Sequence, residues 1–135
     1  MRTLVVLILC ISSLSAVAQK DLLQSGPMLG YSEMREVMLW VQTTEPATVQ
    51  FAYWPEGEKT EVQLTDPYQT SKAEVFTAKV VADAVEPGTT YKYELRINDK
   101  AVKLGYPTVF QTQELWQWRT DPPTFTMALG SCSYV

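Results

Sequence analysis

A proline-glycine turn followed by a strictly alternating segment is the feature that most constrains this chain. Pro87-Gly88 is a strong turn signal, because proline presets φ and glycine supplies the positive φ that other residues avoid. From Tyr91 to Ile97, apolar and polar residues alternate without exception. A period of two is typical of an antiparallel strand with one buried and one exposed face. The segment therefore predicts a β structure that begins at a tight turn.

Tyr91 has the position expected of a tyrosine corner. A tyrosine just inside such a strand can bury its ring and hydrogen-bond through its hydroxyl to backbone at the preceding turn, as in Greek-key sandwiches. The alternative is an ordinary strand that happens to begin with tyrosine. The pattern Pro-Gly-Thr-x-Tyr-x-Tyr at residues 87–93 resembles the sixth strand of fibronectin type III and related immunoglobulin-like domains. We predict structural roles for Tyr91, Pro87 and Gly88.

The first 18 residues have the features of an export signal. Arg2 and the amino terminus supply positive charge, residues 4–14 form an apolar run too short to cross a bilayer, and residues 16–18, Ala-Val-Ala, form a small-x-small cleavage sequence. A buried core helix is the alternative. We predict cleavage after Ala18, which leaves a periplasmic or secreted protein beginning at Gln19.

The mature chain expected from this cleavage is acidic. Its 117 residues carry 10 basic and 15 acidic side chains, a formal net charge of −5 at pH 7. This balance argues against nucleic acid or an anionic membrane as a partner, because both attract clusters of lysine and arginine. No further apolar segment is long enough to span a membrane, and we expect a monomer. Cys132 is the one cysteine left, so no internal disulfide can form.

The body of the chain predicts strands throughout. Short alternating segments and turn signals recur without a helical period, which favours an all-β, immunoglobulin-like sandwich of about seven strands over residues 19–112. Residues 66–72 are polar and predict a loop, and Pro107 predicts an edge strand or a bulge in the last strand. The expected strands cover residues 22–29, 35–44, 49–53, 61–65, 75–81, 89–97 and 101–111, with a tight hairpin at 98–100.

The second expected strand is apolar on both faces. Val37, Leu39 and Val41 share one face, whereas Met38 and Trp40 share the other. A sandwich strand buries one face, and type III domains usually carry an inward tryptophan at this place, so we predict that Trp40 points into the core. The set that contains Leu39 would then face outward, either as ordinary exposed aliphatics or as a docking surface for a neighbouring domain.

Beyond the sandwich, the sequence predicts a linker and one further strand. Residues 113–123 contain two tryptophans and two prolines, which predicts an ordered linker. Residues from 124 onward alternate again and lead into Gly130-Ser131-Cys132. Ligand and metal sites gather at the carboxyl ends of strands in α/β sheets, and a thiolate is a soft ligand for transition metals. The alternative is a loop with an incidental cysteine.

Histidine is absent from the chain, and this removes several kinds of active site. The chain has no Ser-His-Asp or Cys-His combination and no imidazole metal ligand. No glycine-rich phosphate loop follows a strand, and the aspartates lack the spacing of a calcium loop. Tyr53, Trp54 and Tyr68 could form a platform for stacking sugars, although such aromatics belong more often to the core or rim of a sandwich.

The order of these segments resembles the start of an alkaline phosphatase D-type metallophosphatase. The resemblance rests on the export signal, the sandwich, the tryptophan-bearing linker, Val-Met-Leu-Trp at residues 37–40 and Phe-x-Met-Ala-x-Gly-Ser-Cys at residues 125–132. In that family a similar N-terminal domain precedes a catalytic α/β domain of the metallophosphoesterase type. The first catalytic strand ends in a motif whose cysteine ligates iron, which implies a metal-binding role for Cys132.

The resemblance implies a parent enzyme that hydrolyses phosphate mono- or diesters with iron and calcium. The family's other ligands, aspartates with further Asn and His positions, lie in the catalytic domain, of which residues 124–135 are the expected start. We therefore expect a fragment: a non-catalytic N-terminal domain, inactive and without a cofactor by itself, whose partner is the missing catalytic domain. A free-standing exported sandwich that binds a glycan or a protein is the alternative.

Overall fold

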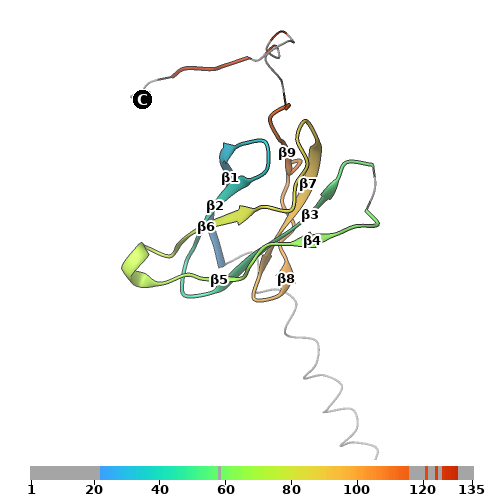
Figure 1. The fold of residues 1–135 in the computed structure, drawn as a ribbon. Helices are drawn as coiled ribbons and strands as arrows, with labels where there is room; N and C mark the ends of the chain where they lie inside the picture. The colour runs from blue at the N-terminus through green and yellow to red at the C-terminus, as the bar shows by residue number, and fades with distance from the viewer. Residues whose placement is uncertain (1–21, 58, 116–120, 122–123, 125, 131–135) are drawn as a thin grey trace, which may run out of the picture.

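The computed structural model describes residues 22–57, 59–115, 121, 124 and 126–130. Over these residues the chain is a sandwich of two antiparallel sheets, so the predicted all-β fold is confirmed (Figure 1). One sheet has the strand order β1-β2-β6; the other has the order β4-β3-β7-β8, with β5 also paired to β3 and β9 to β7. The elements are β1 (Leu23–Ser32), β2 (Val37–Thr43), β3 (Thr48–Pro55), β4 (Gln63–Leu64), β5 (Tyr68–Gln69), a 3-10 helix η3 (Lys72–Glu74), β6 (Thr77–Ala82), β7 (Thr90–Ile97), β8 (Lys100–Ala101) and β9 (Val109–Gln111).

The strand pattern departs from the predicted one in several places. β1 continues to Ser32, three residues past its predicted end. A further strand was predicted from residue 124, but the described residues 124 and 126–130 are not in a strand. The segment predicted as one strand over 101–111 is split into β8 and β9, and the proline at its centre, Pro107, has no amide hydrogen to pair with a neighbour. The predicted loop at 66–72 contains the short strand β5. The strand predicted from Val75 begins two residues later, because Val75 and Phe76 adopt left-handed backbone with φ of 55° and 56°.

The hairpin between β7 and β8 has the predicted tight turn. Asn98 and Asp99 both adopt positive φ, of 49° and 63°, as a two-residue primed turn requires. Asparagine and aspartate tolerate this conformation better than other side chains. The Asn98 side chain also accepts a hydrogen bond of 2.9 Å from the backbone N–H of Thr48, which ties the turn to the start of β3.

The face that β2 buries is the opposite of the predicted one. Val37, Leu39 and Val41 are 0% exposed in the core, whereas Met38 and Trp40 lie half-buried on the outer face. The prediction of an inward Trp40 is therefore wrong. The suggestion that the Leu39 face is an outward docking surface is wrong with it.

Strand register explains why the tryptophan lies outside. Trp40 is paired with Met28 of β1 on one side and with Lys79 of β6 on the other. Leu39 is paired with Val80 of β6, which is buried. Since neighbouring residues of a strand point to opposite faces, an inward Trp40 would bring Lys79 into the core with it. Burying the aliphatic face of β2 instead avoids the free-energy cost of removing the charge of Lys79 from water.

Aromatic rings from the second sheet fill the other half of the core. The rings of Tyr91 and Phe110 are stacked with centroids 5.3 Å apart, and Tyr53 meets Tyr91 edge-on at 6.1 Å. Offset and edge-on pairs of this kind contribute beyond their buried area. The buried core cluster contains Val37, Leu39, Val41, Ala47, Val49, Phe51, Tyr53, Ala78, Val80, Ala82, Val85, Tyr91, Tyr93, Leu95, Ile97, Val102 and Phe110.

The loop between β6 and β7 is held by two tyrosine hydroxyls. The hydroxyl of Tyr91 accepts a hydrogen bond of 2.8 Å from the backbone N–H of Glu86, so the hydrogen bond of the predicted corner is present. The hydroxyl of Tyr53 accepts one of 3.1 Å from the N–H of Ala84. In the turn that follows, Gly88 has φ of +66°, where glycine is favoured.

Removing the Tyr91 hydroxyl should weaken the fold measurably. Tyr91→Phe is expected to lower the free energy of unfolding by ~0.5–1.5 kcal/mol, because it deletes one partly buried hydrogen bond and leaves the ring in place. Urea denaturation followed by circular dichroism measures this change. The matched control is Tyr106→Phe, whose hydroxyl bond to Gly26 is exposed and should cost less. An equal or smaller loss for Tyr91→Phe would contradict the role of the corner.

Alkaline solution should destabilise this sandwich. Burial raises the pKa of Tyr53 and of Tyr93 above the ordinary value of 10.0; the N–H of Ala84 partly offsets this for Tyr53, and the charge of Tyr106 adds to it for Tyr93. Each of these two tyrosines has a higher pKa in the folded than in the unfolded protein. Their contribution to the free energy of unfolding is therefore fully present below pH 10 and is lost as the pH rises through the folded pKa. Melting temperatures between pH 8 and pH 11.5 test this: a constant value through pH 11.5 would contradict it, and Tyr93→Phe should flatten the decline.

Candidate functional site

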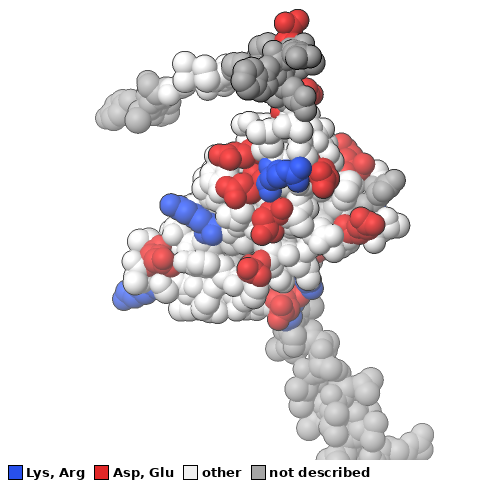
Figure 2. All heavy atoms as spheres, viewed as in Figure 1, with Lys and Arg blue, Asp and Glu red and all other residues white. Residues whose placement is uncertain are grey.

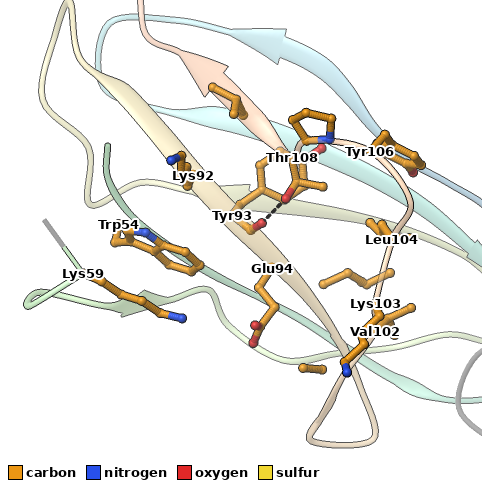
Figure 3. Close-up of a pocket in the computed structure, with 14 residues that line it drawn as sticks. Trp54, Lys59, Lys92, Tyr93, Glu94, Val102, Lys103, Leu104, Tyr106 and Thr108 are labelled. Carbon is orange, nitrogen blue, oxygen red and sulfur yellow. Dashed lines mark hydrogen bonds between the residues drawn. The ribbon is translucent and has the colours of Figure 1, made fainter. Parts of the chain in front are cut away.

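An open groove lies along the middle of β7. Residues 102–108 leave the sheet between β8 and β9 and enclose a hollow of about 470 Å³ against β7 (Figure 3). Backbone hydrogen bonds close both ends: Val102 donates to the carbonyl of Leu95 at 2.9 Å, and Tyr93 donates to the carbonyl of Thr108 at 3.0 Å. The groove is therefore built by a segment that departs from β7 and returns to it.

One side of the groove carries a tryptophan between charged side chains. Trp54 of β3 is paired in register with Lys92 of β7. The ammonium of Lys59 lies 4.5 Å from the centre of the indole ring, a cation-π contact that Figure 3 shows at the mouth of the groove. Lys92 forms an exposed ion pair of 3.3 Å with Glu56. The indole ring thus borders a rim of charged side chains.

The opposite wall is largely apolar apart from Lys103, and its hydroxyl groups already have hydrogen-bond partners. Leu104 and Pro107 belong to this wall. The hydroxyl of Thr108 donates to the backbone carbonyl of Tyr93, as the dashed line in Figure 3 shows. The hydroxyl of Tyr106 donates at 3.0 Å to the carbonyl of Gly26 in the other sheet. The wall can offer stacking and apolar contact, but it presents no activated nucleophile.

The aromatic platform that Tyr53, Trp54 and Tyr68 could have formed is absent. Tyr53 is buried on the core face of β3, whereas Trp54, its neighbour in sequence, lies on the outer face. Tyr68 pairs with Val49 at the far end of β3, and its hydroxyl donates at 2.6 Å to the carboxylate of Glu74. Of the three residues, Trp54 alone borders the groove. Pro107 was the one sequence signal for the departing segment that makes the groove.

The predicted metal ligand, Cys132, cannot be placed. Cys132 and Ser131 lie outside the described residues, as does the predicted export signal at 1–18. In the part of the chain that the structure describes, no three or more His, Cys, Asp or Glu side chains are grouped so that they could hold a metal ion. The described residues also include no helix with the length and hydropathy that a membrane span requires.

Residues 20–115 match a protein family described as Domain of unknown function (DUF7800). This chain belongs to that family. The DUF7800 match covers all the strands of the sandwich. No curated protein matches the chain.

Several solved structures share the fold at low sequence identity. The sensor domain of the anti-sigma factor RsgI4 in Pseudobacteroides cellulosolvens is 14% identical over 73% of this chain and 93% of its own, with a TM-score of 0.53. The structure of PhoD is also 14% identical with a TM-score of 0.53, over 64% of this chain and 18% of PhoD. The third fibronectin III domain of the human KIAA0343 protein is 14% identical over 82% of this chain and 98% of its own, with a TM-score of 0.45.

Proposed function

We propose that this DUF7800 sandwich is the non-catalytic N-terminal domain of an exported phosphoester hydrolase of the alkaline phosphatase D type. The observation that carries the proposal is the fold shared with PhoD, in which the sandwich corresponds to 18% of a longer chain. The resemblance of residues 125–132 to the start of the family's catalytic domain supports it independently. Identity of 14% supports a common fold, so the activity requires its own test.

In this proposal, catalysis takes place in a separate metallophosphoesterase domain that follows the sandwich. The described residues contain no cluster that fits iron or calcium. Cys132 is the one residue of this chain proposed as a metal ligand, and its role rests on the resemblance. The sandwich would position the catalytic domain, and the substrate would be a phosphate mono- or diester.

The test compares the 135-residue chain with the same sandwich expressed together with the metallophosphoesterase domain that its gene encodes. We expect hydrolysis of p-nitrophenyl phosphate or of its bis-ester by the longer protein and none by the shorter one, with or without added iron and calcium. A single thiolate is too few ligands to hold a metal ion firmly, and hydrolysis also requires a nucleophile bound to that metal. The proposal fails if the gene encodes no such domain, or if the longer protein lacks activity.

Export is proposed from the first 18 residues. Arg2 precedes an apolar run that ends in the small-x-small sequence at residues 16–18. We expect mature protein from the periplasm or medium to begin at Gln19. Amino-terminal sequencing of that material tests the cleavage, and a retained Met1 would contradict it.

The groove beside Trp54 favours a second candidate function, a sandwich that binds a glycan. An indole ring next to an apolar wall can stack on the face of a sugar, and Lys59 and Lys92 can bond its hydroxyls or carboxylates. One of the similar folds is itself a sensor domain. The ligand would be a neutral or acidic oligosaccharide.

Titration calorimetry with soluble plant and bacterial oligosaccharides tests the glycan candidate. If a glycan binds, Trp54→Ala should weaken its affinity at least about tenfold, a loss of about 1.4 kcal/mol. Trp40→Ala, on the outer face of the other sheet, is the matched control and should leave affinity unchanged. Absence of binding, or an equal loss in both variants, would remove this candidate.

A further inference from the structure

One end of the sandwich is joined across its two sheets by Gln113. Its N–H donates to the carbonyl of Glu33 at 3.3 Å, and its side-chain Nε2 donates to the carbonyl of Ser32 at 2.9 Å. Its own carbonyl accepts a hydrogen bond of 3.0 Å from the N–H of Gly88. Gln113 therefore bonds the turn between β1 and β2 on one side and the turn before β7 on the other. Figure 1 shows the chain leaving β9 at this end.

Thr112 fixes the same segment from its inner side. This residue is buried, and its hydroxyl donates to the carbonyl of Glu86 at 2.6 Å and accepts from the N–H of Thr89 at 2.9 Å. Its own N–H donates to the carbonyl of Thr89 at 3.1 Å. A Cβ at Gly88 would lie 3.3 Å from the Cγ of Glu114, so the exit segment packs closely on the turn. The direction in which the chain leaves the sandwich is thus determined by both sheets.

A hollow of about 410 Å³ lies beside this exit. Its apolar members include Met34, which is 39% exposed, and Leu115, which is 60% exposed. Figure 2 shows charged side chains of both signs at the end of the sandwich from which the chain continues. The hollow is lined by Glu33, Met34, Arg35, Glu36, Pro87 and Leu115.

We propose that this hollow is the docking surface for the domain that follows in the same chain. The inference rests on the proposed function, which supplies that domain. Leu115 itself lines the hollow, and the next domain is expected to begin at residue 124, so a tether of at most about 30 Å holds that domain near the hollow. Such a tether makes docking intramolecular, which raises the effective concentration of the two surfaces. Exposed Met34 and Leu115 among Glu33, Arg35 and Glu36 match the mixed composition of interfaces between domains.

Calorimetric unfolding of the complete protein tests the docking surface. We expect the two domains of the complete protein to unfold in one coupled transition, and Met34→Asp to separate it into two. The same variant of the 135-residue chain should melt as the parent does, because Met34 is exposed and outside the core. The matched control is Met28→Asp, which puts the same charge on the outer face of β1 and should leave the coupled transition intact.

Three outcomes would overturn the inference. The first is two independent transitions in the unmodified complete protein, which would mean that the domains do not dock. The second is a coupled transition that Met34→Asp leaves unchanged. The third is separation by Met28→Asp instead, which would move the interface to the outer face of β1, β2 and β6. Phosphoesterase activity is measured separately on the same samples, so a failure of the proposed function is distinguishable from a failure of docking.

Discussion

Leu39→Ala is expected to lower the free energy of unfolding by about 2–5 kcal/mol. Leu39 is 0% exposed at the centre of β2, and it faces the aromatic half of the core. Truncation loses the transfer energy of the removed atoms and leaves a cavity that a close-packed core fills only partly. Denaturation in urea, followed by circular dichroism at a fixed pH below 9, measures the loss.

The control for this prediction is the next residue along the same strand. Trp40→Ala removes a much larger side chain from the outer face, where it is half-buried, and should cost less than Leu39→Ala. Side-chain size alone would predict the reverse order. A larger loss for Trp40→Ala would mean that the core lies on the tryptophan side of β2.

Cys132→Ala is expected to disable the complete protein, in which the proposed function places a metal at this residue. Changing groups that merely orient a metal ligand typically costs about 10- to 100-fold in metal affinity or activity, so removal of the ligand itself should cost at least that much. Iron content, measured by elemental analysis, and the rate of phosphoester hydrolysis should fall together. The thiolate contributes negative charge and selects for a transition metal.

Ser131→Ala separates a ligand role for Cys132 from nucleophilic catalysis by its neighbour. In the resemblance on which the proposal rests, the metal ligand is Cys132, and no nucleophilic role is implied for Ser131. We therefore expect Ser131→Ala to keep most of the iron and most of the rate. If Cys132→Ala retains the parent's iron and rate, the ligand assignment fails and the phosphatase proposal loses its second support.

The sequence was informative wherever one residue type or one period constrains the backbone. The alternation of residues 91–97 predicted β7, and Pro87-Gly88 predicted the turn before it. Tyr91 was predicted to reach backbone at that turn, and its hydroxyl does so. Asn98 and the residue after it predicted the hairpin, since few side chains tolerate left-handed backbone. These features depend on neighbours in sequence.

The alternation of apolar and polar residues in the sequence could not predict which face of β2 is buried, and it could not predict the groove. Both faces of β2 are apolar, so the period carries no information on which of them packs inward. The groove depends on where residues 102–108 leave β7, and Trp54 reaches it from another strand. The role of Cys132 remains a prediction, because that residue lies outside the described part of the chain.

By itself, therefore, the sequence determined the class of fold, its principal turn and its tyrosine corner, because local backbone preferences and a period of two are written in adjacent residues. Tertiary structure decided that Leu39 rather than Trp40 enters the core, through the pairing of β2 with Lys79 and its neighbours. It also decided how the chain leaves the sandwich. Gln113 bonds to Ser32, 81 residues away, and no local pattern specifies a hydrogen bond between residues that only folding brings together.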